Sequence, residues 1–122
     1  MTYSVSDLAS DVWGVRLGVV GLGGTPNAAQ IARVQKLYDQ KYAEMAAEDR
    51  VYWSQNDIPD LVAGALGRII AEEICGGIGM QIPTETDNTD GKQVSIGTKG
   101  RRMLAKILAR ERTGLRTQAE YF

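Results

Sequence analysis

Apolar residues recur every three or four positions in four segments of this 122-residue chain, which is the spacing of one face of an α-helix. The segments are residues 7–20, 26–49, 58–78 and 98–112. The third segment has the widest apolar face, so we expect it to be the central helix of the core. The pattern predicts an all-α fold, a small four-helix bundle.

Residues with known capping preferences mark the helix boundaries. Ser6 is a suitable N-cap for the first helix, and Pro26 after Thr25 suits the first position of the second. Glycines follow the first and third helices and would end them. Gly64 and Gly67 lie inside the third helix despite a cost of about 1 kcal/mol each. We therefore expect them to let a neighbouring helix approach closely.

Two segments lack helical periodicity. Residues 80–97 are polar and rich in turn formers, and we expect a long loop or a short hairpin there. Residues 113–122 end in Tyr121-Phe122, and we expect an extended C-terminal tail whose apolar tip docks on another chain. The predicted organisation is a helical domain of residues 1–112 and a docking tail of residues 113–122.

The composition excludes several kinds of chemistry. The chain has no histidine and one cysteine, Cys75, so Ser-His-Asp and Cys-His sites, His-ligated metals and disulfides are ruled out. Cys75 lies near the apolar face of the third helix, where we expect a small buried hydrophobe. We expect no enzymatic activity, no cofactor and no metal.

Three short motifs do not meet the requirements of a site. The glycines of residues 18–24 follow a helix and not a strand, unlike those of a dinucleotide-binding loop. A calcium loop with Gly91 at its sixth position would need an acidic residue at Thr86 and a glutamate at Gly97, and neither is present. Adjacent Glu72 and Glu73 would point about 100° apart on a helix, and Arg68 stands four residues before Glu72. We expect Arg68 and Glu72 to form a solvated ion pair.

No apolar stretch reaches the roughly 20 residues that a membrane helix needs. The first residues also lack the basic flank of a signal peptide. We therefore expect a soluble intracellular chain that makes no membrane contact.

Charge is distributed unevenly along the sequence. Residues 1–98 carry 7 basic and 13 acidic side chains, whereas residues 99–122 carry 7 basic and 2 acidic ones. Four of the basic residues fall within about 80° of one another on the fourth helix: Lys99, Arg102, Lys106 and Arg110. This face is typical of contact with nucleic acid or an acidic protein surface, although a solvated face that only aids solubility is the alternative.

Tyr52-Trp53 places two large aromatic side chains in the connector between the second and third helices. We favour a role as a core plug at that corner. The alternative is an anchor in a protein interface, where both residue types are enriched.

Three stretches resemble the head-to-tail adaptor (connector) proteins of tailed bacteriophages and related gene-transfer particles. They are the Ser6-Asp7-Leu8 helix that ends in glycines before Pro26, the helix from Asp57-Ile58-Pro59-Asp60-Leu61 to Ile78, and the ending from Arg101-Arg102 to Tyr121-Phe122. The ending is the most specific of the three. Together they cover nearly the whole chain.

The resemblance implies a structural virion protein of small helical-bundle fold at the head-tail interface, assembled in the host cytoplasm. About twelve copies would form a ring under the portal protein, extend the DNA channel and provide the attachment platform for the tail. Its partners would be the portal protein, a downstream tail or stopper protein, further copies of itself, and duplex DNA passing through the channel without sequence specificity. The expected partner-binding residues are Lys99, Arg101, Arg102, Lys106, Arg110, Arg112, Thr113, Gly114, Leu115, Arg116, Tyr121 and Phe122.

Two other functions fit the residues less well. A small non-specific DNA-binding module would use the basic face of the fourth helix on phosphates, but the isoelectric point near 5.4 disfavours it. An accessory subunit of an enzyme would dock through Tyr121-Phe122.

Overall fold

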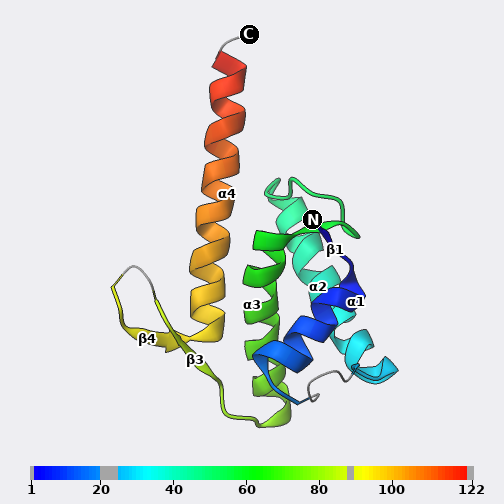
Figure 1. Cartoon of the computed structure of the whole chain (residues 1–122). Helices are drawn as coiled ribbons and strands as arrows, with labels where there is room; N and C mark the ends of the chain where they lie inside the picture. Colours follow the sequence, from blue (N-terminus) through cyan, green and yellow to red (C-terminus); the bar gives the residue numbers. More distant parts are fainter. Residues whose placement is uncertain (1, 20–24, 88–89, 121–122) are drawn as a thin grey trace.

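Four α-helices and two small antiparallel strand pairs make up the fold, as seen in a computed structural model (Figure 1). The structure describes residues 2–19, 25–87 and 90–120, with side chains for residues 3–111 among these. The helices are α1 (Val5–Ser10), α2 (Ala28–Ala47), α3 (Asp60–Ile78) and α4 (Ile96–Glu120), and a π-helix, η1 (Asp11–Arg16), continues α1. The prediction of a small all-α bundle is confirmed.

Helix α3 is the centre of the core, as its wide apolar face predicts. Ten of its residues are buried, among them Leu66, Ile70 and Ile74 with no exposed surface. α4 packs along α3 on one side, and α1, η1 and α2 cover the other (Figure 1). Gly79, with φ +72°, ends α3 in the left-handed conformation that glycine adopts most easily. Cys75 is buried in α3, as expected for a small apolar side chain.

Two glycines allow helices to touch α3 closely. A Cβ atom on Gly67 would lie 2.7 Å from a carboxylate oxygen of Asp11, so this glycine admits η1. A Cβ atom on Gly100 of α4 would lie 2.6 Å from the carbonyl oxygen of Ala65, within the backbone of α3. Gly67 therefore has the predicted role. Gly64 does not, because a Cβ there would approach only the side chain of Arg68 on the same helix.

The first helix differs from its predicted form in start, end and pitch. Ser4 and not Ser6 is the N-cap, because Ser4 and Asp7 form a reciprocal capping box. From Asp11 the chain becomes a π-helix that ends at Arg16. The wider π turn rotates later residues away from the predicted face. Val15, one of the regularly spaced apolar residues of segment 7–20 that we expected on the buried face, is consequently 70% exposed.

Helix α2, unlike the first helix, begins later than predicted. Asn27 is its N-cap, and the backbone N–H of Gln30 donates to the Asn27 side chain while the Gln30 side chain accepts from the Asn27 backbone N–H. This reciprocal pair fixes the start of the helix at Ala28, two residues beyond Pro26.

Two short antiparallel strand pairs fix the N-terminus and the segment between α3 and α4. β1 (Thr2–Tyr3) pairs antiparallel with β2 (Ile58–Pro59), which ties the N-terminus to the start of α3. β3 (Thr84–Thr86) pairs antiparallel with β4 (Gln93–Ser95), and this hairpin stands out beside α4 (Figure 1). The hairpin alternative for residues 80–97 is thus confirmed for these strands.

The expected extended tail is helical as far as the structure describes it. Helix α4 starts at Ile96 and continues to Glu120, past the predicted end at residue 112 (Figure 1). One glycine at position 114 costs the helix only about 1 kcal/mol. The good helix formers Leu, Arg, Gln, Ala and Glu that follow are compatible with continuation. Tyr121 and Phe122 lie outside the described residues.

The prediction of an aromatic core plug at residues 52–53 is confirmed for Trp53. Its side chain is 7% exposed and its Nε1 donates to the hydroxyl oxygen of Tyr38 at 3.2 Å. The Tyr38 hydroxyl donates in turn to the carbonyl oxygen of Gln55 at 2.7 Å. The hydroxyl of Tyr42 donates to the carbonyl oxygen of Trp53. Trp53 is therefore the core plug at the α2–α3 corner, whereas Tyr52 is 39% exposed.

No helix within the described residues is both long and apolar enough to cross a bilayer.

Candidate protein-docking surface

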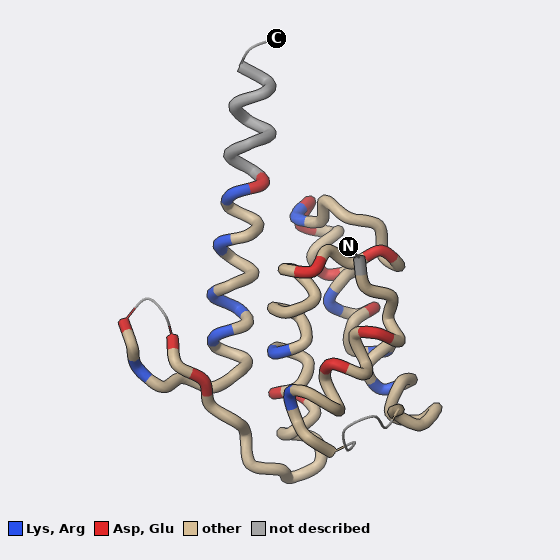
Figure 2. The backbone as a smooth tube through the Cα atoms, in the orientation of Figure 1, with Lys and Arg blue, Asp and Glu red and all other residues tan. Residues whose placement is uncertain are grey.

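Helix α4 carries the candidate surface. Its N-terminal half packs on α3 through Leu104, which is 7% exposed, and its C-terminal half extends past the end of the bundle (Figure 1). Lys and Arg recur along the length of this helix (Figure 2). The hydroxyl of Ser95, just before α4, accepts from the backbone N–H of Thr98, which helps to start the helix.

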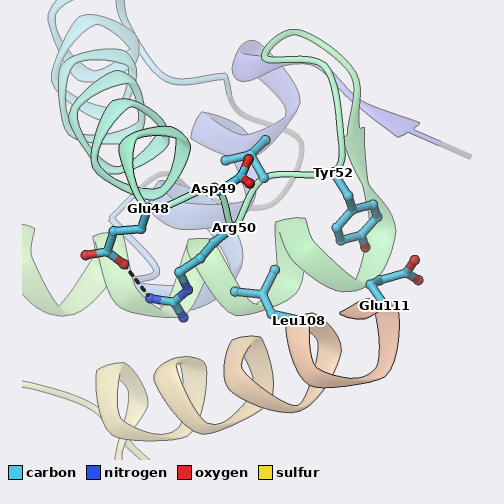
Figure 3. A pocket seen from close by; sticks show the side chains of 7 residues that line it. Glu48, Asp49, Arg50, Tyr52, Leu108 and Glu111 are labelled. Atoms are coloured by element: carbon cyan, nitrogen blue, oxygen red, sulfur yellow. Dashed lines mark hydrogen bonds and ion pairs between the residues drawn. The ribbon is translucent and has the colours of Figure 1, made fainter. Parts of the chain in front are cut away.

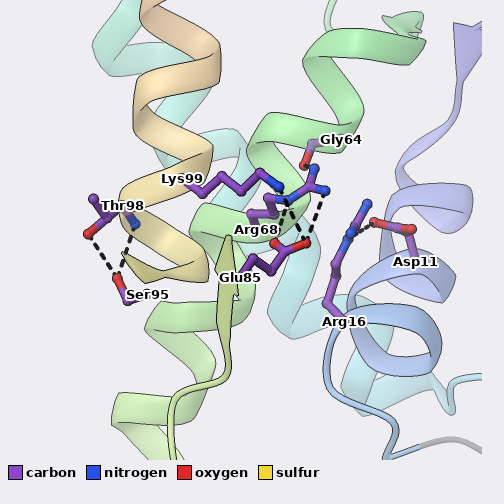
Figure 4. A network of polar contacts seen from close by, with 8 residues as sticks. All are labelled: Asp11, Arg16, Gly64, Arg68, Glu85, Ser95, Thr98 and Lys99. Atoms are coloured by element: carbon purple, nitrogen blue, oxygen red, sulfur yellow. Dashed lines mark hydrogen bonds and ion pairs between the residues drawn. The ribbon is translucent and has the colours of Figure 1, made fainter. Parts of the chain in front are cut away.

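The first basic residue of α4 belongs to a network within the chain (Figure 4). Arg68 of α3 holds the carboxylate of Glu85 on β3 with two donors, Nε at 2.6 Å and Nη2 at 3.3 Å. Lys99 Nζ lies 3.9 Å from the same carboxylate. The hydrogen bond from Arg68 is the main cause that lowers the pKa of Glu85, with Lys99 and Arg16 adding to it. Lys99 is thus partly neutralised, and its side chain is only 18% exposed.

The next two basic residues are also paired within the chain. Arg101 Nη1 lies 3.2 Å from Glu72 Oε2 on α3. Arg102 forms an ion pair with Asp87, which is 6% exposed beside the hairpin. The expected Arg68–Glu72 pair does not form, because Glu85 binds Arg68 with both oxygens and Glu72 faces Arg101 instead. Two parallel hydrogen bonds from an arginine to one carboxylate are stronger than a single exposed ion pair between residues four apart on a helix.

The following residues of the basic face are more open. Lys106 is exposed and lines a shallow hollow of about 400 Å³ with Arg102, Asp87 and Asp90. Arg110 is exposed one turn further along α4. Lys99 and Arg102 of the predicted face are therefore paired with the body of the molecule, whereas Arg110 is exposed nearer the end of the bundle.

The remaining predicted residues are described by backbone alone or not at all. Arg112, Thr113, Gly114, Leu115 and Arg116 belong to the helical backbone of α4, and their side chains are not among those described. Tyr121 and Phe122 lie outside the described residues.

A hollow beside α4 was missed by reasoning from the sequence. It has a volume of about 320 Å³ and lies between the α2–α3 connector and the outer turns of α4 (Figure 3). Tyr52 and Arg50 of the connector face Leu108 and Glu111 of α4. Burial, with a contribution from the Glu111 charge, raises the pKa of the Tyr52 phenol. The only sequence signal for this hollow was the Tyr52-Trp53 pair in a polar connector.

The described residues contain no group of three or more His, Cys, Asp or Glu side chains placed to hold a metal ion. Burial raises the pKa of the Cys75 thiol, which keeps it in the unreactive protonated form at neutral pH.

Comparison of the chain with protein-family models, with curated proteins and with solved structures finds no match.

Proposed function

We propose that this chain is a structural assembly protein, a head-to-tail adaptor that forms a ring under a portal and offers a platform to a tail. The observation that carries the proposal is the projection of α4 beyond the bundle. The resemblance expected from the ending Arg101 to Phe122 is the reason for proposing an adaptor in particular. A helix fixed to a folded body at one end and projecting at the other is suited to join two macromolecules. The protein acts by binding and not by catalysis.

The division of charge supports a contact between unlike surfaces. The body is acidic and the last 24 residues are basic, so the α4 end of one molecule attracts an acidic surface on another. Contacts between unlike patches are the kind that close into rings. A ring also presents many copies of a weak contact at once, which raises the overall binding strength.

Internal pairing disfavours the alternative of a DNA-binding module. Lys99 and Arg102, two of the four residues expected to contact phosphates, already face Glu85 and Asp87. Binding DNA through them would require breaking these pairs.

The test is deletion of residues 113–122, followed by co-sedimentation with the portal protein of the same particle. We expect the truncated protein to lose portal binding and keep its fold, because every buried side chain in the described part lies at or before Leu104. Circular dichroism and thermal unfolding check the fold. Co-sedimentation that survives the deletion would contradict the proposal, as would failure of the full-length protein to bind the portal.

A matched control preserves chain length. A variant with Arg112 and Arg116 replaced by Gln keeps residues 113–122 but removes one positive charge within the tail and one directly before it. If this variant loses binding at low salt, the contact depends on charge. If only the deletion variant loses binding, the contact depends on the apolar end of the tail.

A further inference from the structure

Three elements form the end of the bundle that lies opposite the far end of α4 (Figure 1). They are the end of η1 with the residues after it, the start of α2, and the end of α3 with the residues that lead to β3. The indole Nε1 of Trp13 donates to the carbonyl oxygen of Gln30 at 3.1 Å, and the guanidinium of Arg33 lies against Gly77. We call residues 15–19, 25–33 and 76–83 the base of the bundle.

Apolar side chains are exposed at the base. Six large hydrophobic side chains are exposed in the described part of the chain, and four of them belong to the base: Val15, Val19, Ile78 and Ile82, at 38–70%. Single exposed hydrophobic residues are ordinary on protein surfaces, whereas several at one place mark an interaction site.

The two halves of this apolar group lie near each other. Arg16, which follows Val15, lies beside the Arg68–Glu85 pair, and its charge helps to lower the pKa of Glu85 (Figure 4). Glu85 comes three residues after Ile82, so the end of η1 meets the chain that leads from α3 to β3. The four exposed side chains therefore share one region of the surface.

Most of the base carries no charge. Residues 17–32 and 74–84 contain no Asp, Glu, Lys or Arg. Arg16, at the margin, is paired with Asp11 at 3.2 Å. The body as a whole is acidic, with 13 acidic and 7 basic side chains in residues 1–98. Two copies of the body therefore repel each other least, and bury the most exposed apolar surface, when their bases meet.

We propose that the base binds the base of a second copy of this chain, so that a two-fold axis relates the two molecules. In such a contact the same surface serves on both sides. The interfaces of homodimers are more apolar than the rest of the protein surface, and their cores are poor in charged residues, which is the character of the base. The proposal does not depend on the adaptor function, because the base is separate from α4.

A lipid surface is a poorer occupant of the base. Segments that bind membrane surfaces combine apolar residues and Trp on one face with Lys or Arg on the other. The described residues of the base include no Lys, Trp or Tyr, and Arg16 is already paired with Asp11.

The test is sedimentation velocity of the full chain at rising concentration, in about 0.1 M and about 1 M salt. We expect a monomer–dimer equilibrium that persists at the higher salt, because salt screens attraction between charges and does not weaken apolar contact. Association through the basic face of α4 would instead dissociate at the higher salt. The failure of this proposal is thus distinguishable from the failure of the adaptor function.

Single substitutions locate the contact. Val15→Glu places a charge within the base, and Leu61→Glu makes the same change at a side chain that is 60% exposed outside it. A two-fold axis places each substitution in the dimer twice, so we expect Val15→Glu to weaken dimerisation by about tenfold or more and Leu61→Glu by less than about threefold. Ile78→Gln removes an apolar side chain without adding charge and should also weaken the dimer. Circular dichroism checks that all three variants remain folded.

Four results would overturn the proposal. The first is a chain that stays monomeric up to about 1 mM. The second is dissociation of the dimer at the higher salt. The third is equal weakening by Val15→Glu and Leu61→Glu. The fourth is binding of the chain to phosphatidylcholine vesicles that Val15→Glu abolishes, which would make a lipid surface the occupant.

Discussion

Glu85 joins three parts of the molecule through one carboxylate. It lies on the hairpin strand β3, accepts two hydrogen bonds from Arg68 on α3, and lies near Lys99 on α4. Its side chain is 27% exposed and that of Arg68 is 13% exposed, so solvent screens this pair less than a surface pair. We expect Glu85 to stabilise the position of the hairpin against the bundle.

The variant Glu85→Gln should therefore be less stable than the wild type at neutral pH, by about 1 kcal/mol. The folded state lowers the pKa of Glu85 below its ordinary value of 4.5, so its stabilising effect is complete above that value. The effect is lost as pH falls through the lowered pKa of the folded state. The difference between variant and wild type should thus be constant near pH 7 and shrink below about pH 4.5.

Urea unfolding at several pH values measures this difference. The matched control is Glu48→Gln, which removes a carboxylate that is 63% exposed and bound to Arg50 by one contact. We expect little effect from it, because exposed pairs contribute about 0–1 kcal/mol. A Glu85→Gln effect that grows at low pH would show that the carboxylate does not stabilise the fold.

At the scale of the elements, the contact between α3 and α4 depends on Gly100. The atom nearest to a Cβ at this position is the carbonyl oxygen of Ala65, which belongs to the helix backbone and cannot rotate away. The Gly100→Ala variant should therefore push α4 from α3 and lower the free energy of unfolding by about 1–3 kcal/mol.

Gly76→Ala is the control for this substitution. Gly76 also lies inside a helix, but a Cβ there meets nothing within 4 Å. Its replacement should leave stability unchanged or raise it by up to about 1 kcal/mol through helix propensity. Denaturant titration compares the two variants. A Gly100→Ala protein as stable as Gly76→Ala would mean that the two helices are not held in contact at this point.

The helices could be predicted because their periodicity reflects burial of a single face. The span of α3 and its central position follow from its wide apolar stripe and from Gly79 at its end. The π turn of η1 could not be predicted, because its hydrogen-bonding pattern has no signal in apolar spacing. The end of α4 was missed since Gly114 and the loss of periodicity resemble a helix stop, although propensity alone allows the helix to continue.

At the scale of the whole molecule, pairing between distant segments sets how much positive charge α4 offers to solution. Lys99, Arg101 and Arg102 meet acidic groups 14, 29 and 15 residues away in sequence, respectively. The i, i+4 spacing identifies only partners on the same helix. It therefore predicted the pair of Arg68 with Glu72 and predicted no partner for Arg101. The basic face was predictable, but its partial neutralisation was not.

Salt dependence of duplex DNA binding measures the positive charge that remains available. If all four residues of the basic face bound phosphates, the logarithm of the affinity would fall with that of salt with a slope of about −3.6. With Lys99 and Arg102 paired internally, we expect weak binding and a slope clearly shallower than −3.6. Fluorescence anisotropy with a labelled duplex provides the measurement. A slope near −3.6 would instead support the DNA-binding module.

The direct junction of the β3–β4 hairpin with α4 has a mechanical consequence. β4 ends at Ser95 and the helix begins at Ile96, while the Arg102–Asp87 pair clasps the hairpin to the helix two turns on. Because Glu85 also binds the hairpin to Arg68 of α3, the hairpin is attached to two helices at once, and breaking either ion pair alone would leave it held by the other.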